Sequence, residues 1–66
     1  MRNTYDILTR EMRRAELQEI ITTARNRIAT LEDMRRANPA ATELIGLEIR
    51  EVESAKRKAW NELDRI

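Results

Sequence analysis

The residues that could do chemistry in this chain are arginines and carboxylates, because its 66 residues include no His and no Cys. Without those two residues the chain lacks the commonest general base, the thiol nucleophile and most transition-metal ligands. No nucleotide-binding or calcium-binding motif is present, and no carboxylate pair is flanked by an apolar pocket or a Gly-rich loop. We therefore expect no enzyme activity, no metal site and no cofactor.

One group of arginines could bind phosphate. Arg10, Arg13 and Arg14 are close in sequence, and a two-fold axis would double them into a basic patch on a dimer. A nucleic-acid interface needs such a patch without acidic neighbours, yet glutamates are interleaved here, and we expect Arg10 and Arg14 to lie near Glu62. The 13 basic and 12 acidic residues also give a net charge of only +1, so no global field attracts nucleic acid or anionic lipid.

Nearly the whole sequence favours helix, and one dipeptide divides it. Strong helix formers dominate, with a single Gly and a single Pro. Pro39 lacks the donor that an interior helix needs and disfavours helical geometry at Asn38. We expect one helix over about residues 4–37, capped by Asn3, and a second over about 39–65, whose first turn the Asn38 side chain caps.

The apolar spacing of both halves predicts an all-α antiparallel hairpin that forms one domain over residues 1–66. In the first helix, steps of three and four residues give the 3.5-residue seam of coiled-coil packing: Leu17, Ile21, Ala24, Ile28 and Leu31. The apolar face of the second helix comprises Ala41, Leu44, Ile45, Val52, Ala55, Ala59, Leu63 and Ile66. Counting outward from the turn places Leu31 near Ile45 and Leu17 near Ala59.

A lone hairpin leaves part of the first helix unexplained. That helix is longer than its partner, so roughly 10 Å of it should project. The projecting end carries a separate apolar stripe, well over 90° around the helix from the seam: Tyr5, Leu8, Met12 and Ala15. We expect a second copy to cover this stripe, giving a homodimeric four-helix bundle. The alternative is that residues 4–15 form a separate short helix, folded back on the hairpin.

Two positions near the middle of the second helix are unusual. Glu48 falls on a seam step, where a carboxylate is costly unless it is paired. We expect it either to lean to the edge and reach water, Arg25 or Arg27, or to specify register as single polar core positions do. Gly46 costs roughly 1 kcal/mol relative to Ala inside a helix, so it either admits another backbone or is simply tolerated.

Three further residues of the second helix lie off its apolar stripe. Leu47 and Trp60 are candidate contacts for a partner or for the dimer, because aromatic residues and arginine dominate binding hot spots. Ile49 is expected beside Trp60 on the flank of the helix. No apolar run approaches the roughly 18 residues of a membrane span, so we expect a cytoplasmic protein with no membrane partner.

Length, two helices and seam spacing together resemble the Rop-like hairpins, small RNA-binding regulators that dimerise into four-helix bundles. The likeness extends to no residue motif, so no RNA-contacting residue carries over. The chain is also similar in general character to small phage-encoded helical inhibitors of host proteins. These resemblances imply a regulator that masks a surface of another protein, such as a host transcriptional regulator, or else an RNA- or DNA-binding dimer that uses the arginine patch. A purely structural assembly component is a third possibility.

Overall fold

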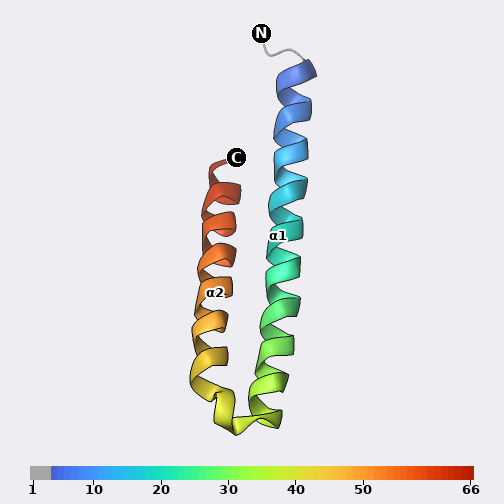
Figure 1. Cartoon of the computed structure of the whole chain (residues 1–66). Helices are drawn as coiled ribbons and strands as arrows, with labels where there is room; N and C mark the ends of the chain where they lie inside the picture. Colours follow the sequence, from blue (N-terminus) through green and yellow to red (C-terminus); the bar gives the residue numbers. More distant parts are fainter. Residues whose placement is uncertain (1–3) are drawn as a thin grey trace.

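The computed structural model describes the backbone of residues 4–66 and the side chains from residue 6 onward. Helix α1 spans Thr4–Ala37, a short 3-10 helix η1 spans Pro39–Ala41, and helix α2 spans Thr42–Arg65. Figure 1 shows α1 and α2 side by side and antiparallel, with the N-terminal end of α1 projecting past the end of α2. The predicted all-α hairpin is confirmed, as a single layer that measures 58 × 14 × 12 Å.

Helix α1 is continuous from its first residue to the turn. The alternative in which residues 4–15 fold back as a separate helix is therefore excluded. Asn3 and the side chain of Tyr5, which the sequence assigned to a cap and to the apolar stripe, lie outside the described residues. Within the part of the chain that the structure describes, neither helix holds an apolar stretch that could cross a membrane.

The turn uses backbone groups where the sequence predicted a side-chain cap. Asn38 makes no side-chain capping hydrogen bond; its amide donates to the Met34 carbonyl at 2.9 Å, and its own carbonyl accepts from the amide of Ala41 at 3.0 Å. The Thr42 hydroxyl donates to the carbonyl of Pro39 at 2.6 Å. The predicted side-chain cap is wrong, and the α-helix begins three residues after Pro39 because one 3-10 turn comes first.

The buried seam confirms the predicted register of the two helices. Leu17 and Leu31 are each 1 % exposed, and they belong to two separate clusters along the hairpin. The cluster near the open end joins Leu17 and Ile21 to Ala59. The cluster near the turn joins Leu31 to Ile45, as counting from the turn predicted.

Three predictions for the flanks of α2 are wrong. Ile49, expected beside Trp60 on the surface, is 7 % exposed and packs in the cluster with Leu31. Leu44 and Ala55, expected in the seam, are exposed. Near the turn, the face of α2 that packs on α1 is therefore rotated from the predicted one toward Ile49. The side of α2 that carries Leu44 is left exposed.

Candidate interaction surface

An open groove of about 700 Å³ runs along one face of the hairpin. Its apolar lining comes from both helices: Ile20 and Ala24 of α1, and Val52 and Ala55 of α2. Charged and polar side chains complete it: Glu16, Glu19, Thr23, Arg27 and Glu51. The volume falls in the range of ligand pockets, but the groove is open to solvent, so it suits an extended apolar surface better than an enclosed small molecule.

Two alanines contribute to the hollow. Counting from the turn at Asn38, Ala24 is level with Val52 and Ala55 is level with Ile21, so the two alanines lie on opposite helices about three residues apart along the hairpin. Both have only a methyl side chain, and both line the groove. The sequence signal for the groove is therefore one small residue on each helix, about a turn apart, where larger side chains would fill the space.

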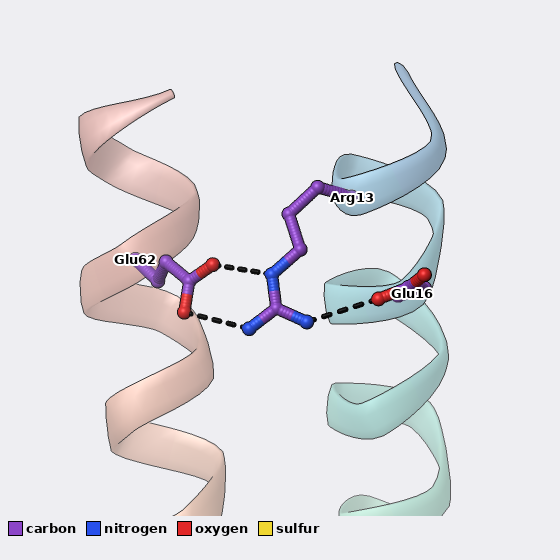
Figure 2. A network of polar contacts seen from close by, with 3 residues as sticks. All are labelled: Arg13, Glu16 and Glu62. Atoms are coloured by element: carbon purple, nitrogen blue, oxygen red, sulfur yellow. Dashed lines mark hydrogen bonds and ion pairs between the residues drawn. The ribbon is translucent and has the colours of Figure 1, made fainter. Parts of the chain in front are cut away.

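Cross-helix ion pairs lie toward both ends of the groove. At the open end, the guanidinium of Arg13 donates to both carboxylate oxygens of Glu62, at 2.5 and 2.9 Å, and to Glu16 at 2.9 Å. Figure 2 shows this side chain reaching from α1 to α2 while its third nitrogen turns back to Glu16. The hydrogen bonds with Glu62 and Glu16 raise the pKa of Arg13 above its ordinary value, and the hydrogen bond from Arg13 lowers the pKa of Glu62.

Toward the turn, Arg27 of α1 donates to a carboxylate oxygen of Glu48 of α2 at 2.5 Å. The side chain of Glu48 remains 45 % exposed. Of the two expectations for Glu48, the structure therefore confirms the one in which it leans to the edge of the seam and reaches an arginine. Because both residues are well exposed, the pair fixes the alignment of the helices more than it stabilises them.

Exposed apolar residues continue the groove face in both directions. Met34 follows Arg27 by seven residues on α1, and Leu44 precedes Glu48 by four on α2, so both lie on the groove side near the turn. At the other end Met12 precedes Glu19 by seven residues and continues the same edge of α1 toward its projecting end. Leu44 is 74 % exposed and Met12 65 % exposed.

The projecting end of α1 is exposed as the sequence predicted. The apolar stripe that begins there and continues alongside α2 includes Leu8, Met12 and Ala15, all exposed, and Ile7 adds an exposed side chain that the stripe did not include. Nothing in the described part of the chain covers these residues. The second subunit expected over them stays a prediction.

A smaller apolar surface lies on the opposite side of α2. Trp60 follows Glu51 by nine residues, two and a half helical turns, so it points away from the groove. It is 40 % exposed and lies in a shallow depression with Glu53, Lys56 and Arg57. A neighbouring depression that also includes Glu53 contains the exposed Leu47. Leu47 and Trp60, the candidate contact residues of α2, are thus accessible and lie in adjoining depressions.

The arginine patch is largely paired with carboxylates. Arg13, and not Arg10 or Arg14 as predicted, holds Glu62, while Arg14 lies 3.5 Å from Glu11. Counting from the turn gave the level of Glu62 correctly but not the side of α1, and neighbouring residues of a helix point 100° apart. Two of the three arginines are therefore neutralised by carboxylates of the same chain.

The described residues contain no group of three or more acidic, His or Cys side chains that could hold a metal ion. No protein family matches the chain, and no curated protein or solved structure gives a significant match. The surfaces described above are therefore the basis for a functional interpretation.

Proposed function

We propose that the chain is a non-enzymatic protein–protein interaction module that works as a homodimer and binds and masks a surface of another protein. The observation that carries this proposal is the amount of surface left open by a single layer of two helices. The chain exposes 5532 Å², whereas a compact monomer of 7.8 kDa exposes about 4,400 Å². The excess, roughly 1,100 Å², is larger than the ~800 Å² that each partner buries in an interface of standard size.

The two apolar surfaces of the chain suit two different contacts. The groove face is long and apolar, and small soluble oligomers are most often two-fold dimers. The Trp60 depression is short and is lined also by Glu53, Lys56 and Arg57, and tryptophan and arginine are enriched in binding hot spots. A dimer formed through the groove face leaves the Trp60 depression free. The partner protein therefore docks at Trp60, and Leu47 lies at the edge of that contact.

The partner's surface should combine apolar and acidic groups, because the indole shares its depression with two cations, Lys56 and Arg57, and only one carboxylate, Glu53. In this account the module acts by occupying that surface, as a small regulator or inhibitor does, and needs no chemistry of its own. A host transcriptional regulator, bound by a phage-encoded chain, is one partner of this type.

Affinity capture with the full chain as bait tests the proposal. Wild-type protein and the Trp60→Ala variant are immobilised separately, and proteins enriched from a bacterial lysate are then purified and titrated against each bait. We expect one protein to bind the wild-type chain directly, with at least tenfold weaker binding to Trp60→Ala and unchanged binding to the control Thr22→Ala. Direct binding that is unaffected by Trp60→Ala would contradict the assignment of this surface.

Nucleic-acid binding is the competing outcome. Labelled RNA and DNA duplexes titrated with the chain at several salt concentrations would reveal it, because phosphate contacts make the affinity fall steeply with salt. Duplex binding that Arg10→Ala and Arg14→Ala weaken, together with no protein partner, would replace the proposal with a Rop-like regulator. We expect no such binding, since Arg13 and Arg14 already contact carboxylates.

A further inference from the structure

The groove lined by Ala24 and Ala55 has features that suit a self-complementary contact between two copies of the chain. Ile20 also lines the groove and is 41 % exposed, although it is a large aliphatic side chain. A hollow lined by small residues and an exposed isoleucine on the same face could supply the two halves of a knob-into-hole contact. One copy can supply the knob and a second copy the hole.

We infer that a second copy of this chain covers the groove face, in an antiparallel arrangement in which Ile20 of each chain fills the hollow beside Ala24 of the other. The two turns then lie at opposite ends of a four-helix bundle, and the two α1 helices pack against each other. This inference rests on the proposed homodimer and adds the face and the orientation, which the proposed function leaves open.

The order of charges along α1 supports this occupant. Glu16 precedes Ile20 on the groove face and Arg27 follows it. A two-fold axis between Ile20 and Thr23 reverses that order in the second copy. It therefore places Glu16 of one chain beside Arg27 of the other, so that opposite charges meet across the contact in addition to the ion pairs that each makes within its own chain.

The charges of α2 repeat the pattern. Glu51 lies before Ala55 on the groove side, and Lys58 follows Ala55 by three residues. The same axis brings Glu51 of one copy level with Lys58 of the other. Neither residue has an ion-pair partner among the described residues of its own chain, so the dimer would supply one to each.

The projecting end of α1 selects the antiparallel arrangement. If both turns lay at the same end, the two projecting ends would lie diagonally across from each other with no helix beside them. In the antiparallel arrangement each projecting end runs along the turn end of the other α1. There Met12 and Leu8 of one copy approach the exposed Met34 of the other, and these apolar side chains are removed from water together.

Two neighbouring threonines allow a matched test, because the chain has no native Cys. Thr23 lines the groove within two residues of the proposed axis, so the two copies of Thr23 come within one helical turn of each other across the contact; Thr22 is exposed but lies 100° around the helix. Full-length Thr23→Cys and Thr22→Cys are first checked for native helicity under reducing conditions. They are then oxidised and their masses compared, since a disulfide forms only between closely placed β-carbons.

We expect oxidised Thr23→Cys to have the mass of a disulfide-linked dimer and oxidised Thr22→Cys to keep the mass of a single chain. If the protein is dimeric in solution but only Thr22→Cys cross-links, or neither does, the groove contact is wrong while the proposed interaction module stands. If the reduced protein is a monomer at every concentration, both the groove contact and the homodimer fail, and binding through Trp60 is judged separately by the Trp60→Ala titration.

Discussion

Arg13 and Glu62, 49 residues apart in sequence, close the open end of the hairpin through two hydrogen bonds of 2.5 and 2.9 Å. The pair lies one helical turn before Leu17, the first buried residue of α1, beside the cluster against which Leu63 and Ile66 pack. It therefore ties α2 to α1 about one helical turn before α2 ends at Arg65.

Low pH should weaken the ion pair between Arg13 and Glu62. Because hydrogen bonding by Arg13 lowers the pKa of Glu62 in the folded chain, its contribution to stability is fully present above its ordinary pKa of 4.5. That contribution is lost as the pH falls through the lower folded value. We expect the melting temperature of the wild-type chain to fall more between pH 6 and pH 3 than that of Glu62→Gln, followed by circular dichroism.

Glu53→Gln is the matched control for the acid series. Glu53 also lies on α2 but has no ion-pair partner among the described residues. Its substitution should leave the pH dependence as steep as in the wild-type chain. If Glu62→Gln retained the full acid sensitivity, the ion pair would not contribute to closure.

The hairpin core should be intolerant of truncation. Leu31 is 1 % exposed in the cluster near the turn, and replacing a buried leucine by alanine costs about 2–5 kcal/mol. Since the core is thin, we expect Leu31→Ala to abolish cooperative unfolding at 25 °C or to lower the urea midpoint strongly. Leu47→Ala, at an exposed position of α2, should change the free energy of unfolding by less than about 0.5 kcal/mol. Equal effects of both changes would contradict the described packing.

Gly46 offers a stabilising substitution that also reports on contacts outside the chain. A β-carbon built at this position meets no atom within 4 Å, and the residue lies inside α2 with no positive φ. Gly46→Ala should therefore raise the free energy of unfolding by up to about 1 kcal/mol, as measured by urea denaturation. Loss of stability would instead reveal a backbone packed against this position, on the side of α2 away from the groove.

Much of the fold follows from local sequence rules. The single Pro and the 3.5-residue spacing sufficed to place both helices, the turn and the facing pairs such as Leu31 with Ile45. The side-chain cap at Asn38 failed because the backbone can close the turn by itself. Either the side chain of Asn38 or its backbone carbonyl can accept hydrogen bonds from the first amides of the next helix. The backbone dihedral angles at Asn38 decide which of them does so, and the residue types do not determine those angles.

The edges of the apolar face of α2 were harder to predict than the middle of that face. Spacing gave the direction of the apolar face, but Leu44 and Ile49 lie on its two edges, and a small rotation of the helix decides which one is buried. The groove was missed for a related reason. Ala24 and Ala55 were both assigned to the seam, and only the assembled hairpin shows that together they leave a hollow.

Sedimentation equilibrium over a wide concentration range, with helicity measured by circular dichroism on the same samples, tests the central claim of a homodimeric interaction module most directly. We predict a helical species of about twice 7.8 kDa that persists at the lowest concentrations at which it can be detected. Loss of helix on dilution would still agree with the claim, because folding and association would then be one event. A fully helical monomer of 7.8 kDa at every concentration would contradict it.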